Sequence, residues 1–143
     1  MGSVIPPTVP SVYFDTNCFI YRFEGIEPFW TLLQPVFEAA TAGAMAIITS
    51  ELTLLECLVK PRRMGDAPLE RMLRDALANS REVRLLPISR EVIDRAIDCR
   101  ALHSIRTPDA IHAATALAHG CSSFYTNDAG FARVAGLNVK LLS

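Results

Sequence analysis

The residues best suited to chemistry in this sequence are four widely separated acids: Asp15, Glu56, Asp109 and Asp128. Asp15 directly follows the apolar run 11–14, and Asp128 comes shortly after the similar run 123–126. Both runs have the composition of buried strands, and in open α/β sheets the functional site lies beyond the carboxyl ends of the strands. We therefore expect Asp15 and Asp128 at one edge of a parallel sheet.

Asp109 is predicted to lie at the same edge. Thr107 can cap a helix and Pro108 suits its first position, which places Asp109 in the first turn. Because this helix leads back into the strand over 122–126, its N-terminus must lie at the carboxyl end of that strand. A carboxylate in the first turn also favours the helix dipole, so this position has a purely structural explanation as well.

Glu56 lies further along a helix predicted over 51–59. It is the only charged residue between Leu52 and Val59, so we expect this helix to be largely buried. A lone carboxylate in such a place is costly unless something pairs with it, and a buried arginine would serve as well as a functional partner.

Converging carboxylates raise one another's pKa unless a cation lies between them. Mg²⁺ and Mn²⁺ prefer carboxylate and water oxygens, whereas the four cysteines and three histidines show no zinc-binding spacing. A hard divalent ion can polarise a phosphate and activate a water molecule for attack. The four acids therefore indicate phosphodiester cleavage, although turn formation and helix capping explain each of them singly.

The elements that must position these acids alternate between apolar runs and helical periods. This alternation predicts a three-layer α/β/α sandwich with a mostly parallel central sheet. Residues 1–10 are expected to form a flexible leader, and residues 11–143 a single domain. Strands are predicted over 11–14, 45–48, 83–87, 122–126 and 138–142, and helices over 16–23, 28–43, 51–59, 66–80, 90–102, 107–120 and 129–134.

Composition narrows the class of protein. Half of the 143 residues are apolar and the net charge is −1, so no general basic field attracts a polyanion. The one basic cluster, 60–63, is either a solvated loop or a local phosphate contact through Arg62 and Arg63. No apolar stretch is long enough to cross a bilayer, and we expect a cytoplasmic protein with reduced, mostly buried cysteines.

Four segments around the acids, in the same order, resemble the motifs of the PIN domain family, and in particular the small prokaryotic toxins of the VapC type. The resemblance covers the chain from about Ser11. It implies Mg²⁺- or Mn²⁺-dependent endoribonuclease activity, a homodimer, and inhibition by a cognate antitoxin protein that docks over the active site. The segments are VYFDTN (12–17), ELTLLE (51–56), TPDAIHAATA (107–116) and TNDAGF (126–131).

The resemblance also implies roles for individual residues. Asp15 and Asp109 resemble the principal metal ligands of the family, Asp128 completes the acidic pocket, and Glu56 helps to place metal or attacking water. Asn17 and Thr126 match polar positions that brace the pocket, although both also suit local turns or caps. His112 lies near the face of Asp109, but we expect it to be a partly buried structural histidine and leave it out of the catalytic set.

Two other classes of protein compete with this hypothesis. Aspartyl-phosphate phosphatases of the haloacid dehalogenase type also place an Asp after the first strand, but they need a second Asp where this chain has Asn17. A non-catalytic partner-binding module with a PIN fold remains the main alternative.

Overall fold

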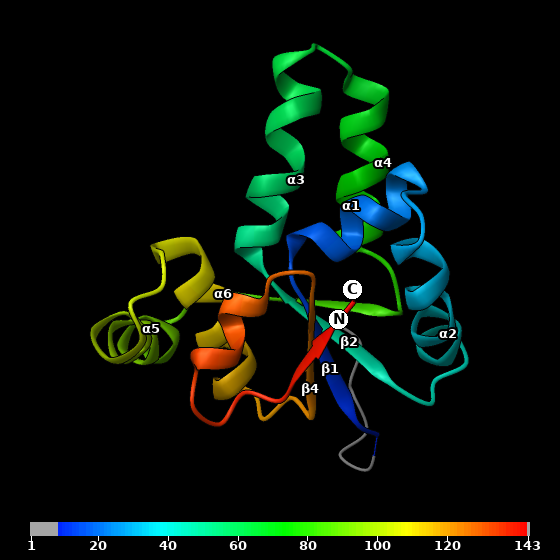
Figure 1. Cartoon of the computed structure of the whole chain (residues 1–143). Coiled ribbons are helices and arrows are strands. Elements are labelled where there is room, and N and C mark those ends of the chain that lie inside the picture. The colour runs from blue at the N-terminus through cyan, green and yellow to red at the C-terminus, as the bar shows by residue number, and fades with distance from the viewer. Residues whose placement is uncertain (1–8, 143) are drawn as a thin grey trace.

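The fold is built around a parallel five-stranded sheet (Figure 1). This computed structural model describes residues 9–142, so the predicted leader lies almost entirely outside the described residues. The strands are arranged in the order β3-β2-β1-β4-β5, and every neighbouring pair is parallel. Their bounds are β1 Ser11–Phe14, β2 Ala46–Ser50, β3 Val83–Leu86, β4 Ser123–Thr126 and β5 Val139–Leu141.

Helices cover both faces of the sheet, which confirms the predicted three-layer α/β/α sandwich (Figure 1). Within the described residues, no helix is long and apolar enough to cross a membrane. The helices are α1 Thr16–Glu24, α2 Phe29–Thr41, α3 Glu51–Arg63, α4 Ala67–Ala78, α5 Arg90–His103 and α6 Thr107–Ala118, with a short 3₁₀ helix, η1, at Ala129–Arg133.

Alternation along β1 divides the core between the two faces. Tyr13 stacks on Phe124 with ring centroids 5.0 Å apart, in the layer that α5 and α6 cover. Phe14, the next residue, contacts Phe37 of α2 edge-on at 5.2 Å, in the layer that α1 and α2 cover. Because successive strand side chains point to opposite faces, an almost continuous apolar run serves both layers.

α3 and α4 form an antiparallel hairpin that projects beyond the sheet (Figure 1). The predicted end of α3 at Val59 is wrong, because the helix continues through Pro61 to Arg63. Proline removes only its own amide donor, and the helical pattern persists beyond it: the Met64 N–H donates to the Lys60 carbonyl at 3.0 Å. The basic cluster 60–63 is therefore the last turn of a helix rather than a loop.

Helices that begin at the carboxyl edge of the sheet position the site. α1 starts one residue after β1, and Asp15 is its N-cap. α3 follows β2 directly, and the Ser50 hydroxyl accepts the Leu52 N–H at 3.0 Å. The expected cap at Thr107 is wrong: Arg106 occupies the N-cap position of α6, which makes Asp109 the third helical residue.

Candidate active site

Asp15 is the most deeply buried of the four acids, with 6% of its surface exposed. One carboxylate oxygen, Oδ1, caps α1 by accepting the Cys18 N–H at 3.3 Å, and the other, Oδ2, accepts the Thr126 hydroxyl at 2.6 Å. Burial raises the pKa of this carboxyl, and the hydrogen bond from Thr126 only partly offsets that effect. The ionised form of Asp15 is therefore energetically unfavourable in this buried place unless a cation lies nearby.

Asp128 is connected to Asp15 through a single side chain. Its backbone N–H donates to the Thr126 hydroxyl at 3.0 Å, and that hydroxyl donates to Asp15. The Asp128 carboxylate caps η1, where Oδ1 accepts the Gly130 N–H at 2.8 Å. A Cβ atom on Gly130 would lie 3.0 Å from this oxygen, so a side chain there would crowd the carboxylate.

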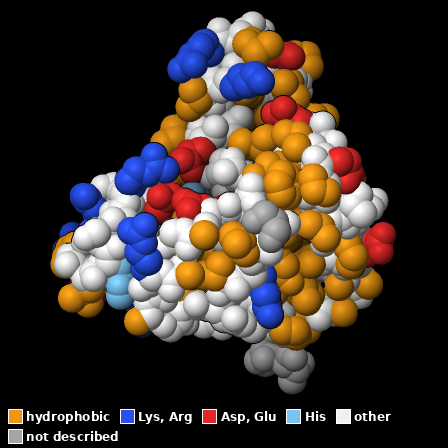
Figure 2. All heavy atoms as spheres, viewed as in Figure 1, with side chains coloured by type: hydrophobic (Ala, Val, Ile, Leu, Met, Phe, Trp, Pro, Cys, Tyr) orange, Lys and Arg blue, Asp and Glu red, His pale blue; other side chains and the backbone are white. Residues whose placement is uncertain are grey.

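Asp109 and Asp128 face the same small cavity of about 210 Å³. Arg106 and Arg133 line it too, and Arg106 Nε lies 3.4 Å from Asp109 Oδ2. In Figure 2, acidic side chains gather in a hollow in the middle of the molecule, with basic side chains beside it. Arg106 and Arg133 are far apart in the chain, and only the fold brings both of them to the cavity of the acids.

Glu56 belongs to a second, adjoining group. Its Oε1 accepts the Thr16 hydroxyl at 2.5 Å and lies 3.0 Å from His112 Nε2. The hydrogen bond to His112 lowers the pKa of Glu56 more than partial burial raises it. Thr16 follows Asp15 directly in the chain, so the two groups of acids meet at the start of α1.

The expectation that α3 is largely buried is wrong. Leu55 and Val59 are 61% and 42% exposed, and the Glu56 side chain is 35% exposed. The apolar run of α3 is thus divided between a buried side with Cys57 and Leu58 and an exposed side with Leu55 and Val59. Glu56 is balanced by Thr16 and His112 instead of a buried arginine.

The supporting positions differ in what the structure assigns to them. Thr126 is fully buried and connects Asp15 with Asp128. Asn17 is exposed on α1, and its bracing role stays a prediction. Arg62 and Arg63 do not line the cavity of Asp109 and Asp128; Arg62 instead pairs with Glu70 of α4, with Nε 3.0 Å from Oε1.

Two buried residues near the acids, Tyr13 and Thr16, escaped the sequence argument, and a third, His112, was left out of the catalytic set. Nothing in local spacing pairs His112 with Glu56, which lies 56 residues away in the chain. The one available signal was that His112 follows Asp109 by three residues and so shares its side of α6. His112 is indeed buried, as expected, but it contacts a candidate catalytic acid directly.

The donor set suits a hard divalent ion, since the acids offer only carboxylate oxygens. Asp109 and Asp128 share a cavity, and Asp15 is one hydroxyl away from Asp128. Over residues 9–142, however, no three His, Cys, Asp or Glu side chains stand together as a ready-made metal site. The chemistry fits such an ion, and side-chain adjustment would have to complete the ligand set.

Comparison with known proteins identifies the family. The PIN domain model matches residues 12–137. The chain therefore belongs to the PIN domain family, a family of nucleases. A search of curated proteins finds no match.

Several solved structures with the same fold are described as toxins or as complexes with an antitoxin. A chain of a toxin–antitoxin complex from Klebsiella pneumoniae is 26% identical, with a TM-score of 0.69 over 92% of this chain and 98% of that one. VapBC2 from Rickettsia felis, bound to a promoter DNA fragment, gives 16% identity and a TM-score of 0.73 over 93% and 99%. VapC20 from Mycobacterium tuberculosis, described as a sarcin-ricin loop cleaving toxin, gives 16% and 0.68 over 88% and 95%.

Proposed function

We propose that the protein is a divalent-metal-dependent endoribonuclease and the toxin of a toxin–antitoxin pair. One observation carries this proposal: in a PIN fold, Thr126 joins Asp15 to Asp128, and Asp128 shares a cavity with Asp109. The three acids thus lie near the sheet edge where such folds place their sites, although their carboxylates are not yet gathered around one point.

Asp15, Asp109 and Asp128 are the residues that would hold Mg²⁺ or Mn²⁺. When bound, the ion supplies Lewis-acid polarisation of the phosphate and a more acidic water molecule. The chain supports this assignment through Asp15, whose buried carboxyl has a raised pKa and gains most from a nearby positive charge.

Glu56 is the acid that orients the attacking water. Its carboxylate is partly exposed beside Asp15 and keeps a lowered pKa, so it is ionised and able to accept a proton from water at neutral pH. Thr126 and Asn17 act as supporting residues around the acids.

RNA is the proposed substrate. Arg106 and Arg133 at the acidic cavity are suited to phosphate oxygens, and the exposed side chain of Arg106 is free to leave its weak pair with Asp109. Arg62 and Arg63 lie further along α3 and would contact RNA only at a distance from the scissile bond. The neighbour described as cleaving the sarcin-ricin loop supports this substrate class.

A cognate antitoxin is the proposed regulatory partner. The Klebsiella structure is a toxin–antitoxin complex, and its match covers nearly the whole of both chains. In this chain, an apolar cavity of about 380 Å³ opens between α1, α3 and α4, with Glu56 among its lining residues. A segment bound there would cover one of the catalytic acids.

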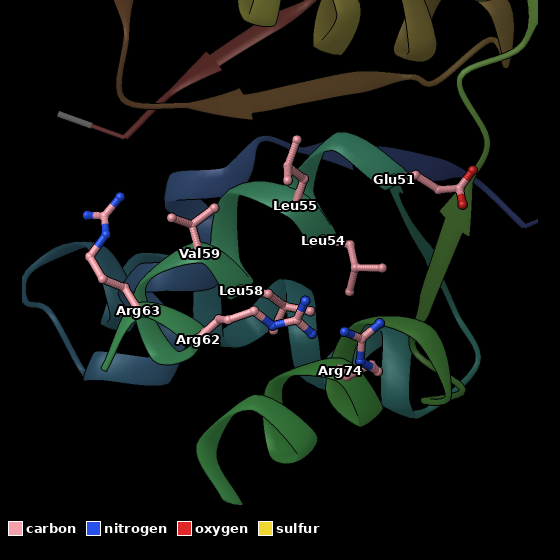
Figure 3. Close-up of a pocket in the computed structure, with 8 residues that line it drawn as sticks. All are labelled: Glu51, Leu54, Leu55, Leu58, Val59, Arg62, Arg63 and Arg74. Carbon is pink, nitrogen blue, oxygen red and sulfur yellow. The ribbon is translucent and has the colours of Figure 1, made fainter. Parts of the chain in front are cut away.

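We place the homodimer contact on the exposed side of α3 (Figure 3). A groove of about 650 Å³ runs along this helix. Leu54, Leu58 and Arg62 line it on the side toward α4, and Leu55 and Val59 line it on the side that points away from α4. Neighbouring apolar side chains that are exposed in this way are typical of a surface that binds another protein.

α5 of a second copy of the chain is suited to pack against this surface of α3. It exposes Ile93 and Ile97, which would pack against the exposed apolar side chains of α3. Both α3 and α5 contact α6, so a two-fold contact of this kind would lie close to Asp109. A groove shared by two copies would add to the basic surface available to RNA.

RNA cleavage tests the proposed function directly. Purified protein is incubated with a panel of structured and single-stranded RNAs plus Mg²⁺ or Mn²⁺, beside Asp15→Asn and Asp109→Asn variants. Asp75→Asn is the matched control, because Asp75 is an exposed acid of α4 that bonds Asn79 instead of the site. We expect cleavage by wild type and Asp75→Asn only.

Equal cleavage by all variants would contradict the assignment of the acids. If no RNA is cut with either metal while an antitoxin still binds, the alternative of a non-catalytic PIN-fold binding module is the better description.

A further inference from the structure

A hydrogen-bonded chain connects the core of the sheet to Glu56 through His112. The Tyr13 hydroxyl of β1 lies 2.5 Å from His112 Nδ1, and His112 Nε2 lies 3.0 Å from Glu56 Oε1. Tyr13 and His112 are 0% and 3% exposed. The chain crosses from β1 to α6 to α3, so three elements fix its geometry.

Chemistry sets the direction of each hydrogen bond. An ionised carboxylate only accepts, so His112 Nε2 must carry the proton that it shares with Glu56. In the neutral imidazole, Nδ1 is then the acceptor, and the Tyr13 hydroxyl donates to it.

Both donors to Glu56 bind the same oxygen. The Thr16 hydroxyl and His112 Nε2 each contact Oε1, and among the described residues no hydrogen bond engages Oε2. The terminal torsion of a glutamate is otherwise broad. Two donors on one oxygen restrict that torsion and leave the other oxygen of this partly exposed side chain without a hydrogen bond from the described residues.

We propose that His112 is a positioning residue, which through Nε2–H holds the Glu56 carboxylate so that Oε2 is presented to the attacking water. This role rests on the proposed nuclease function. It differs from simple packing, because an apolar side chain of similar size would fill the same space without orienting Glu56. Tyr13 supports this role, because its hydroxyl donates to Nδ1 and so favours the tautomer of His112 that carries its proton on Nε2.

The test compares His112→Leu, His112→Gln and Glu56→Gln with the double variant His112→Leu/Glu56→Gln. Partners that orient a functional residue typically contribute 10- to 100-fold, so we expect kcat of His112→Leu to fall by roughly that factor with little change in KM. His112→Gln keeps an N–H donor and should recover part of the loss. The double variant should be no slower than Glu56→Gln alone, since both changes remove the same function.

Thr115→Val is the matched control for burial. Thr115 is also fully buried in α6, but its hydroxyl donates to the Ile111 carbonyl and not to an acid. We expect it to keep the wild-type kcat. Thermal unfolding of every variant separates a loss of folded protein from a loss of orientation.

A measurement independent of activity examines the ring itself. The ¹⁵N spectrum of the wild-type protein should show His112 protonated at Nε2 and unprotonated at Nδ1, and Glu56→Gln should shift the Nε2 signal. A ring protonated only at Nδ1 would overturn the proposal even if His112→Leu does not fold.

The outcomes also separate this proposal from the proposed function. If Asp15→Asn cuts RNA as well as wild type, the nuclease assignment fails and the positioning role fails with it. If Asp15→Asn is inactive but His112→Leu keeps the wild-type kcat, only the positioning role is overturned.

Discussion

The hydroxyl of Thr126 lies 2.6 Å from Oδ2 of Asp15, and both residues are buried. The same hydroxyl oxygen accepts the backbone N–H of Asp128 at 3.0 Å. β1 and β4 are neighbours in the sheet, so their ends are held in fixed register and one threonine can serve both. The relative position of Asp15 and Asp128 therefore depends on a side chain that is not itself acidic.

Removing the Thr126 hydroxyl should weaken the fold at this point. We expect Thr126→Val to lower the free energy of unfolding by roughly 1 to 3 kcal/mol, because Asp15 Oδ2 and the Asp128 N–H both lose a partner. Urea denaturation measures the change. Thr115→Val is the control, since the Ile111 carbonyl that it frees lies within a helix, and equal losses in both variants would argue against the special role of Thr126.

Asp15→Asn should stabilise the metal-free protein while abolishing activity. Burial raises the pKa of Asp15 in the folded state, so the folded protein binds this proton more tightly than the unfolded chain does. Stability therefore falls as pH rises from the ordinary value of 3.8 through the raised pKa, and it stays lower above that pKa. In EDTA at neutral pH we expect Asp15→Asn to gain roughly 0.5 to 2 kcal/mol.

The same experiment at low pH provides the control. Below both pKa values the wild-type carboxyl is neutral, and the advantage of Asp15→Asn should shrink as the pH is lowered. An advantage that does not change with pH would point to packing rather than charge.

Divalent ions should stabilise the wild type through the acids. A ligand that binds only the folded state adds about 2.7 kcal/mol at a concentration one hundred times its Kd. We expect Mg²⁺ or Mn²⁺ to raise the Tm of wild type and Asp75→Asn, and to leave Asp15→Asn and Asp109→Asn nearly unchanged. Ca²⁺ titrations would show whether the site discriminates by ion size, and an equal rise in all variants would place binding elsewhere.

The α3–α4 hairpin carries its own pH dependence. Hydrogen bonds from Arg62 and then Arg74 lower the pKa of Glu70 from 4.5 to about 2. A lowered pKa means that the contribution of Glu70 to stability is present above about 4.5 and is lost as pH falls toward about 2. In Arg62→Gln, a ¹³C titration should show the Glu70 carboxyl moving back toward its ordinary pKa, whereas Arg63→Gln should leave it unchanged.

The proposed dimer contact can be disrupted by one charge. Leu55→Asp places a carboxylate on the exposed apolar face of α3 and should convert a dimer to a monomer in sedimentation velocity measurements. Leu32→Asp is the matched control, because Leu32 is 51% exposed on α2, away from this groove. A wild-type protein that remains monomeric at high concentration would rule out the homodimer.

Patterns of residues close together in the sequence were sufficient to predict most of the strands and helices and their parallel arrangement. Apolar runs such as 11–14 alternate with helical periods, which determines a parallel sheet covered on both faces, and the structure has that sheet. Asp15 and Asp128 cap the helices that follow β1 and β4, so their place at the sheet edge follows from residues close by in the sequence. The PIN motifs around the acids were equally recognisable, because each motif is a short continuous segment.

Burial and pairing required the tertiary structure. The apolar stretch of α3 suggested a core helix, but Leu55 and Val59 are exposed because they point away from α4, the helix against which α3 packs most extensively (Figure 3). Periodicity reports which residues share a helix face, not what covers that face.

The contacts that surround the acids are likewise long-range. Glu56 meets His112 from 56 residues away, and Thr126 meets Asp15 from 111 residues away. The sequence by itself determined which acids lie at the sheet edge, since capping and strand ends are local. Only the tertiary structure decided which neighbours hold those acids: the pairing of β1 with β4 brings Thr126 to Asp15, and the packing of α6 against α3 brings His112 to Glu56. A hydrogen bond between distant segments depends on the register of the whole fold.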